Sequence, residues 1–374
     1  MQENFIVSAR KYRPTTFDTV VGQEHISTTL KNAIKSQHLA QAFLFCGPRG
    51  VGKTTCARIL AKTINCFNIT SATEACDVCP SCISFNEGRS LNILELDAAS
   101  NNSVEDIRHL IDQVRFAPQL GSRKIYIIDE VHMLSTAAFN ALLKTLEEPP
   151  AHALFILATT ERHKILPTIL SRCQIFDFKR IQIQDIAQHL SSIAKKENVI
   201  ADEDALHLIA QKADGGLRDA LSMFDQMVTF CGDSLSYRAV VENLNVLDVS
   251  VYFSLTDAFL NRDIAFLLNA YNGVLKNGFD GHQFVIGFAE HLRNLLVAKY
   301  EETLSLLEFS KHIREKYQEQ TQKCSAQFIF SALNICSETE QVYKASKNQR
   351  LLVEIALMQM ASIGLEENLQ KKKE

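Results

Sequence analysis

The stretch GPRGVGKT at residues 47–54 constrains this chain more than any other feature. It fits the pattern G-x-x-x-x-G-K-[ST], whose glycines let backbone N–H groups surround phosphates at a helix N-terminus. The apolar run AFLFC precedes it as a predicted strand, and TCARILAKTI follows as a predicted helix. The predicted nucleotide-binding residues are Gly47, Pro48, Arg49, Gly50, Val51, Gly52, Lys53, Thr54 and Thr55. Among them, we expect Lys53 to reach the β- and γ-phosphates and Thr54 to supply a hydroxyl to Mg²⁺.

Short aliphatic runs recur through the first half of the chain. Four of them, at 42–47, 91–98, 124–130 and 153–160, are each followed by a helix-compatible stretch. Continuous apolar runs of this length predict buried parallel strands, and their alternation with helices predicts helices on both faces of one sheet. A fifth candidate strand lies at 174–178, and the strand pattern ends there. The predicted fold is therefore an α/β P-loop domain at 1–180 with a parallel sheet flanked by helices.

From Ile181 onward the apolar periodicity is that of helices. We expect a bundle of three short helices at 181–244, with the middle one at 202–213. The apolar positions predicted for its first and third helices are Ile186, Leu190 and Ile193, and Leu217, Leu221, Phe224 and Val228.

A second helical region is predicted at 245–366. Its apolar positions form either a core or a surface for a partner helix; they include Leu255, Phe259, Phe284, Phe288, Leu292, Leu295, Leu351, Leu352 and Ile355. The tail at 367–374 is predicted to be solvated.

The composition excludes some classes of protein. At 374 residues the chain is too long for one compact core, so two or three domains are expected. No apolar run approaches the roughly 20 residues of a membrane span, so we expect no membrane association. Ten cysteines without a secretory signal indicate a cytoplasmic protein. The formal net charge of −4 argues against gross attraction to nucleic acid but leaves a local basic surface open.

Acidic and hydroxyl side chains follow two of the predicted strands. Asp129 and Glu130 end IYIIDE, where Asp129 can hold Mg²⁺ and Glu130 can polarise an attacking water. An acidic pair after a strand can also simply begin a loop, but its place after a P-loop favours hydrolysis. Thr160, at the end of the next strand, is a candidate sensor of the γ-phosphate, although a threonine there can be purely structural.

Two arginines are further candidates for catalysis. Arg172, in ILSRC, could complete the active site of a neighbouring subunit as an arginine finger, or it could form a surface ion pair. Arg218 lies in the first turn of a predicted helix, after Gly215 and Gly216, where a cation is locally disfavoured. An anionic partner is therefore expected, either a nucleotide phosphate or an acidic side chain.

Four cysteines, Cys66, Cys76, Cys79 and Cys82, follow the pattern C-x9-C-x2-C-x2-C. The x2 spacing lets two thiolates face one ion, so the set predicts a closed, structural Cys₄ zinc site. Reduced cysteines can instead be buried as small apolar side chains. Three cysteines in seven residues of a polar segment favour zinc.

Taken together, these motifs resemble those of the γ/τ subunits of the bacterial DNA polymerase III clamp loader, which are AAA+ ATPases. The resemblance covers residues 1–230. It is carried by the P-loop, the cysteines, ILSRC, GGLRDAL and three longer stretches, ARKYRPTTFDTVVGQEHI, LDAASNNSVEDIR and IIDEVHMLSTAAFNALLKTLEEPP. It implies an AAA+ core containing a zinc module at 66–82, a helical lid, and a C-terminal collar for oligomerisation. It also implies that Arg172 is a finger acting in trans, that Arg218 is the lid sensor, and that adenine lies near Tyr12, Arg13, Pro14, Val20 and Val21.

The resemblance also implies a mechanical function. ATP binding would tighten a ring that opens a sliding clamp around primer–template DNA, and hydrolysis would release the closed clamp. The implied partners are δ and δ′ subunits, further γ/τ copies, the clamp, and DNA through its phosphate backbone. Ser103, three residues before Asp106, could begin a phosphate-facing helix or only cap it. The τ form continues beyond residue 366 of this chain, which would then be a γ-length product, a truncation or a short natural protein.

Other functions remain as alternatives. A non-hydrolysing assembly subunit, like δ′, would be expected to have a degraded P-loop, whereas this one is intact. A branch-migration motor or a protein-remodelling ATPase would share the P-loop, but neither predicts the four cysteines or the long helical region that follows the lid.

Overall fold

The computed structural model describes residues 6–119, 121–244 and 246–363. The chain divides into two compact units. The first comprises the residues up to Glu197 together with Ile209–Phe230, and the second comprises Asn198–Leu208 and the residues from Cys231 onward.

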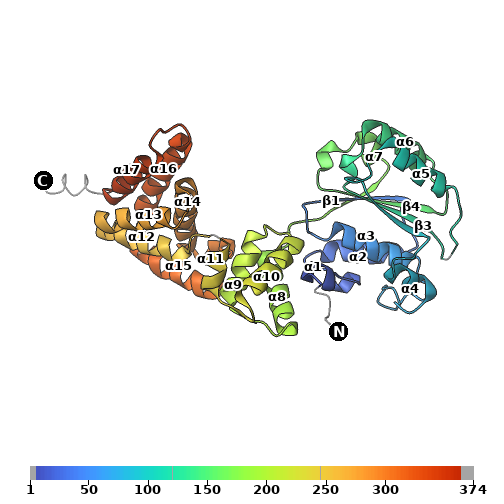
Figure 1. Cartoon of the computed structure of the whole chain (residues 1–374), viewed down its shortest axis with the longest axis horizontal. Coiled ribbons are helices and arrows are strands. Elements are labelled where there is room, and N and C mark those ends of the chain that lie inside the picture. Colours follow the sequence, from blue (N-terminus) through green and yellow to red (C-terminus); the bar gives the residue numbers. More distant parts are fainter. Residues whose placement is uncertain (1–5, 120, 245, 364–374) are drawn as a thin grey trace, which may run out of the picture. The chain divides into compact units, whose positions relative to one another are not determined.

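A five-stranded parallel sheet forms the centre of the first unit (Figure 1). Its strands are β1 (Ala42–Cys46), β2 (Ile93–Asp97), β3 (Lys124–Asp129), β4 (Ala153–Thr159) and β5 (Gln174–Asp177). They lie in the order β2-β3-β4-β1-β5, and every neighbouring pair is parallel. All five predicted strands are confirmed, with ends that differ by at most two residues.

Helices cover both faces of this sheet, as predicted. Helices α2 (Glu24–Lys35) and α3 (Lys53–Ile64) pack on the face that carries Phe43 and Phe45. The opposite face is covered by α5 (Val104–Val114), α6 (Thr136–Glu147) and α7 (Pro167–Leu170). Because both faces are buried, the strands are apolar throughout instead of alternating.

The strand order places three loops together at the carboxyl edge of the sheet. The P-loop follows β1, Asp129 and Glu130 follow β3, and β4 lies between those two strands. Thr159 and Thr160, at the end of β4, are therefore held between the P-loop and the acidic pair.

Two helices of the predicted lid belong to the first unit. The predicted apolar positions of α8 (Ile183–Lys196) and α10 (Leu217–Cys231) are buried, with the exception of Val228, which is only partly buried. Its neighbour Met227 is fully buried instead. The middle predicted helix is α9 (Glu203–Lys212).

The prediction that strands end at 178 is wrong. Two short strands, β6 (Ile200–Ala201) and β7 (Ser234–Leu235), pair in parallel in the second unit. Two residues are too few to produce a periodic signal.

The rest of the second unit is helical in the described residues. It contains α11 (Tyr237–Asn243), α12 (Val249–Asn261), α13 (Ile264–Lys276), α14 (Gly281–Ala298), α15 (Lys311–Lys323), α16 (Ala326–Tyr343) and α17 (Gln349–Ala361). The predicted apolar residues of α12 and α14 are all buried in one core.

Helix α17 departs from the sequence-based prediction. Leu351 and Ile355 are 46% and 41% exposed, whereas Val353 and Leu357 are buried. Both faces of the helix carry apolar residues, so periodicity could not decide which one packs inward. The face with Leu351 and Ile355 is not core, which leaves the predicted alternative of a surface for a partner helix.

The tail predicted at 367–374 lies outside the described residues. Within the described ranges, no helix is long and apolar enough to cross a membrane.

Candidate functional site

At three positions of the P-loop, including Gly47 and Gly52, the backbone has a positive φ that favours glycine. Gly47 has φ 149°, and a Cβ there would lie 2.5 Å from the carbonyl oxygen of Phe178. Gly52 has φ 103° and caps the N-terminus of α3. The two glycines thus direct the chain from β1 into α3 around a concave turn of backbone.

Lys53 is bonded within this turn. Its Nζ donates to the carbonyl oxygens of Gly47 at 2.8 Å and Pro48 at 2.7 Å. Burial lowers the pKa of the Lys53 amine, and the nearby carboxylates of Glu130 and Asp129 act in the opposite direction. Because backbone carbonyls are neutral acceptors, anionic phosphate oxygens would be stronger partners for this ammonium group.

Thr54 and Asp129, the two predicted Mg²⁺ ligands, come into direct contact. The Thr54 hydroxyl donates to Asp129 Oδ2 at 2.6 Å, and Asp129 Oδ1 accepts the backbone N–H of Glu130 at 2.9 Å. Both side chains offer oxygen atoms, the donor type that Mg²⁺ prefers. This pair fits the hydroxyl and carboxylate contacts that P-loop proteins use for the ion.

Glu130 has a left-handed backbone, with φ 47° and ψ 44°. Such a conformation is uncommon for a residue with a side chain, and it costs about 1–3 kcal/mol. Glu130 Oε2 accepts hydrogen bonds from the backbone N–H of Thr160 at 3.2 Å and from its hydroxyl at 2.9 Å. The structure therefore connects the predicted base to the predicted sensor, which sequence alone could not establish.

A cavity of about 460 Å³ opens over these residues, entirely within the first unit. It is lined by the predicted residues Tyr12, Arg13, Pro14, Val20, Val21, Arg49, Gly50, Val51, Gly52, Lys53, Thr54, Thr55, Asp129, Glu130 and Arg218. Sequence reasoning missed six others, Val7, Ala9, Arg10, Ile181, Leu217 and Leu221. Leu217 and Leu221 had been assigned only to the lid core, because a stripe of leucines does not show that it also borders a cavity.

The charge of the cavity favours a polyanion. Five of its lining side chains are cationic (Arg10, Arg13, Arg49, Lys53 and Arg218), and two are carboxylates (Asp129 and Glu130). Burial, and then the neighbouring Arg58, lower the pKa of Arg13. Because cations that lie close together repel one another, the binding of an anion among them is electrostatically favourable.

The N-terminal segment that borders the cavity is fastened to the lid helices by contacts that the sequence did not reveal. Asp225 of α10 accepts the backbone N–H of Ser8 at 2.6 Å. Glu197, after α8, accepts a hydrogen bond from the Tyr12 hydroxyl and pairs with Lys11 at 2.6 Å. These acidic residues carry no motif, so only the fold brings them to Tyr12.

The two candidate arginines differ in position. Arg218 lines the cavity, and its backbone N–H lies 3.4 Å from the carbonyl oxygen of Gly50. Among the described residues, no carboxylate forms an ion pair with Arg218. Arg172 does not line the cavity; it pairs with Glu147 at 2.9 Å and donates to the carbonyl oxygen of Thr168 at 2.7 Å.

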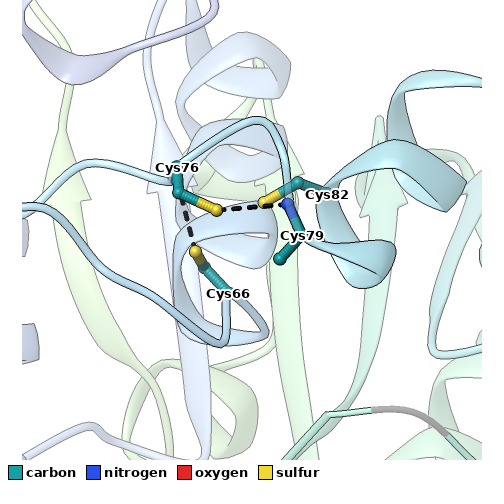
Figure 2. A group of neighbouring side chains, drawn as sticks. All are labelled: Cys66, Cys76, Cys79 and Cys82. Atoms are coloured by element: carbon teal, nitrogen blue, oxygen red, sulfur yellow. Dashed lines mark hydrogen bonds between the residues drawn. The ribbon is translucent and has the colours of Figure 1, made fainter.

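The four cysteines of the predicted zinc module converge (Figure 2). Their sulfur atoms all lie within 4.8 Å of one another. Four thiolates around one Zn²⁺ at about 2.3 Å would place their sulfurs roughly 4 Å apart, so the group fits a tetrahedral ion. Backbone N–H groups of Cys76 and Cys79 lie 3.2 and 3.3 Å from the sulfurs of Cys66 and Cys76, an arrangement that stabilises thiolates.

Glu74 and Asp77 hold the cysteine segment against the rest of the first unit. Glu74 accepts the backbone N–H of Phe17 at 3.0 Å and pairs with Lys31 at 2.8 Å. Asp77 pairs with Lys62 of α3 at 2.6 Å. The short helix α4 (Pro80–Asn86) then leads back toward β2.

Comparisons with known proteins cover nearly the whole chain. Residues 22–182 match the family model for the DNA polymerase III delta subunit, and residues 185–233 match that for the ATPase lid domain of the DNA polymerase III clamp loader subunit. Residues 235–372 match domain III of the DNA polymerase III subunits gamma and tau. Three successive models from one assembly thus follow one another along the chain.

Two curated relatives show the extent of the likeness. The chain is 40% identical over 351 residues to a DNA polymerase III subunit tau of Bacillus subtilis (strain 168), covering 94% of this chain and 62% of the relative. It is 36% identical over 364 residues to a DNA polymerase III subunit gamma of Buchnera aphidicola subsp. Acyrthosiphon pisum, covering 96% of this chain and 99% of that one. The chain therefore spans less than two thirds of that tau subunit and nearly all of that gamma subunit.

Among solved structures, a RuvB Holliday junction branch migration motor of Thermotoga maritima is 20% identical, with a TM-score of 0.47 over 72% of this chain and 86% of that chain. The sequence relatives and the three family models decide the assignment. The chain belongs to the γ/τ family of DNA polymerase III clamp-loader subunits, which have an AAA+ ATPase fold.

Proposed function

We propose that this chain hydrolyses ATP as a motor subunit of a bacterial clamp loader, opening a sliding clamp and loading it onto primer–template DNA. The observation that supports this most strongly is the cavity of the first unit, where the P-loop lysine, the Thr54–Asp129 pair and Glu130 meet four further cationic side chains. A degraded, non-hydrolysing subunit would not need all of these groups together.

Each group has a role in the proposed reaction. Lys53 and Arg218 would contact phosphate oxygens, and Thr54 and Asp129 would hold Mg²⁺, which neutralises charge on the phosphates. Glu130 would orient a water molecule and accept its proton as the water oxygen bonds to the γ-phosphorus. The bond between that phosphorus and the β,γ-bridging oxygen would break, which leaves ADP and inorganic phosphate.

Adenine would occupy the end of the cavity formed by Tyr12, Arg13, Pro14, Val20 and Val21. These residues supply an aromatic ring, apolar side chains and fixed backbone, which suits a flat heterocycle. The contact of Tyr12 with Glu197, and that of the nearby Ser8 with Asp225, would make base binding sensitive to lid position.

Arg172 would act on a neighbouring subunit. It lies outside its own cavity, and its side chain is one third exposed, so the guanidinium is available to a partner. Its ion pair with Glu147 is exposed and therefore weak, worth about 0–1 kcal/mol, so exchange for a phosphate in the partner's site would cost little.

DNA contacts are best placed on the groove between α5 and α6. Arg108, Arg115 and Lys144 line it, and none of the three forms an ion pair within the part of the chain that the structure describes. The N-terminus of α5 fits this role less well, because Ser103 and Asp106 already satisfy each other in a capping box there. Contacts through the three cations would be to backbone phosphates and independent of sequence.

We propose that residues 1–180 form the AAA+ core with a zinc module at 66–82, residues 181–244 the lid, and residues 245–366 the collar. Zn²⁺ would be held by the four converged thiolates and would stabilise the 66–82 segment. The proposed partners of the assembled ring are δ and δ′ subunits, further γ/τ copies and the clamp.

The test is ATP hydrolysis by wild type and Glu130→Gln. We expect the variant to bind ATP as tightly as wild type and to lose at least about 100-fold in turnover, because it keeps the shape but not the base. Equal turnover by the two proteins would refute hydrolysis at this site.

A further inference from the structure

One oxygen of Glu130, Oε2, has polar groups close to it on two sides. Thr160 supplies two of them, its backbone N–H and its hydroxyl, at 3.2 and 2.9 Å from Oε2. His132 Nδ1 lies 3.4 Å from the same oxygen. Within the residues that the structure describes, the other oxygen, Oε1, has no hydrogen bond or ion pair, and Glu130 itself lines the nucleotide cavity.

His132 is placed where it can hold that carboxylate. It lies in the 3₁₀ turn Val131–Met133 that follows β3 and Glu130, and its side chain is only 6% exposed. Its Nδ1 also lies 3.1 Å from the hydroxyl oxygen of Thr159, which is buried at the end of β4.

The second imidazole nitrogen contacts a different carboxylate. His132 Nε2 lies 3.3 Å from Glu161 Oε1. Glu161 is itself fixed, because its backbone N–H donates to Thr159 Oγ1 at 3.0 Å and its carboxylate pairs with Lys164 at 2.9 Å. The ring of His132 is therefore held from both sides and has little freedom to turn.

We propose that His132 is a positioning residue for Glu130. Together with Thr160 it fixes Oε2, which leaves Oε1 free to take the proton of the attacking water. Because His132 also contacts Thr159 and Glu161, which flank Thr160, the orientation of Glu130 depends on the position of the end of β4. This inference rests on the proposed function, because it assigns a role within the same hydrolysis site.

The physical reason is the sensitivity of proton transfer to geometry. A displacement of about 1 Å in a reacting group can cost roughly 100-fold in rate, even when binding is unaffected. Glu130 already has an uncommon left-handed backbone, so its side chain depends on contacts with its surroundings for orientation. The contacts of its carboxylate are with Thr160 and His132 in the described part of the chain.

The test compares His132→Ala and His132→Gln in the full-length chain, with the ATP dissociation constant and single-turnover hydrolysis measured separately. We expect His132→Ala to lower the hydrolysis rate about 10- to 100-fold while the ATP dissociation constant changes less than about twofold. His132→Gln should recover part of the rate, because its amide can still donate to Glu130. The control is His163→Ala, an exposed histidine 3.5 Å from the other oxygen of Glu161, which should match wild type.

A double-mutant cycle separates positioning from general damage. In the Glu130→Gln background, His132→Ala should cause no further loss, because its effect passes through the Glu130 carboxylate. A further loss as large as in wild type would overturn the proposal. So would a wild-type rate in His132→Ala, or equal losses of binding and turnover.

Glu161→Gln provides a second test in case His132→Ala does not fold, because it preserves the shape of the side chain. It should lower the hydrolysis rate but not the affinity for ATP, and an unchanged rate would contradict the proposal.

The outcomes also separate this inference from the function on which it rests. If Glu130→Gln is inactive and His132→Ala is fully active, the positioning role is wrong and the hydrolysis site stands. If Glu130→Gln turns over ATP like wild type, the proposed function fails and the positioning role fails with it.

Discussion

The chain contains two clusters of hydrogen-bonded polar side chains, one around the P-loop and one around His291. They use similar chemistry, but they differ in function. Around the P-loop, Lys53 donates to backbone carbonyls and Thr54 donates to Asp129, beside a cavity of about 460 Å³. In the second unit, His291 contacts the Tyr317 hydroxyl at 3.0 Å and Gln320 Oε1 at 3.2 Å, and is 1% exposed.

The difference between the clusters lies in what could replace their internal bonds. Each hydrogen bond of the P-loop cluster involves one charged group that borders the cavity. A phosphate or a metal ion can therefore replace the present partner of that group with a stronger one. The hydrogen bonds of the His291 cluster are closed within an apolar core, where Gln320 Nε2 also donates to the carbonyl oxygen of Phe253 at 2.7 Å. Satisfied polar groups thus indicate function in the first case and specificity of packing in the second.

The largest expected effect comes from removing the charge in the first cluster. Lys53→Ala should weaken ATP binding by about 2–5 kcal/mol, or roughly 30- to 4,000-fold, because a charge-assisted contact in a partly buried site is lost. The unfolding midpoint without nucleotide should change little, since only bonds to neutral carbonyls disappear. Titration with a fluorescent ATP analogue measures the first effect, and unchanged affinity would contradict the assignment of the cavity.

A third cluster, the four thiols, is expected to behave like the first, because it also gathers groups that an ion can bridge. The protein should contain one zinc per chain, and Cys79→Ser should lose most of it, since one thiolate of four is removed. Cys231→Ser is the matched control, because Cys231 lies outside the cluster. Metal analysis of the purified proteins decides, and equal zinc in both variants would exclude the site.

The two faces of α17 allow a comparison of how much a buried and an exposed apolar side chain contribute to stability. Leu357→Ala should lower the free energy of unfolding by about 2–5 kcal/mol, because Leu357 is 1% exposed in the core. Ile355→Ala should change it by less than about 0.5 kcal/mol, since Ile355 is 41% exposed on the surface face of the helix. Denaturant unfolding of the full chain, at a concentration where it is monomeric, distinguishes the two. Equal losses would mean that the exposed face is packed.

The most gradual effect is a loss of stability on acidification, which comes from the second cluster. Burial lowers the pKa of His291 to about 3, so the folded chain keeps the ring neutral while the unfolded chain protonates it below its ordinary pKa of 6.5. Its contribution to stability is therefore complete above pH 6.5 and is lost as the pH falls toward 3, by at most about 1.4 kcal/mol per pH unit.

The control for this pH effect is His291→Gln. It should be less stable at pH 7.5 but should lose less stability than wild type between pH 6.5 and 5. Parallel stability curves for the two proteins would contradict a neutral, buried His291.

The sequence predicted those parts of the fold that depend on continuous patterns. All five sheet strands and the P-loop helix could be read directly, because buried parallel strands are apolar throughout and GPRGVGKT has few other uses. The face of α17 and the two-residue strands β6 and β7 could not, since either face of the helix is apolar and two residues have no period. In these cases tertiary packing decides.

The candidate site divides in the same way. Lys53, Asp129 and Glu130 lie within motifs and could be predicted one by one, whereas the strand order that brings them together came from the structure. His132, Asp225 and Glu197 act through distances between separate elements, and no spacing along the chain encodes those. His132 follows Glu130 by two residues within the stretch IIDEVHMLSTAAFNALLKTLEEPP, so its closeness in sequence was the one signal that could have pointed to it.

The most direct test of the account is steady-state ATP hydrolysis by the assembly with δ, δ′ and clamp subunits, for wild type and Arg172→Ala, with and without primer–template DNA. The account predicts strong stimulation by primed DNA in wild type, and its loss in Arg172→Ala with ATP binding retained, because the finger acts on a neighbour's site. Turnover that responds to neither DNA, clamp nor Arg172 would contradict a shared, DNA-triggered ATPase site.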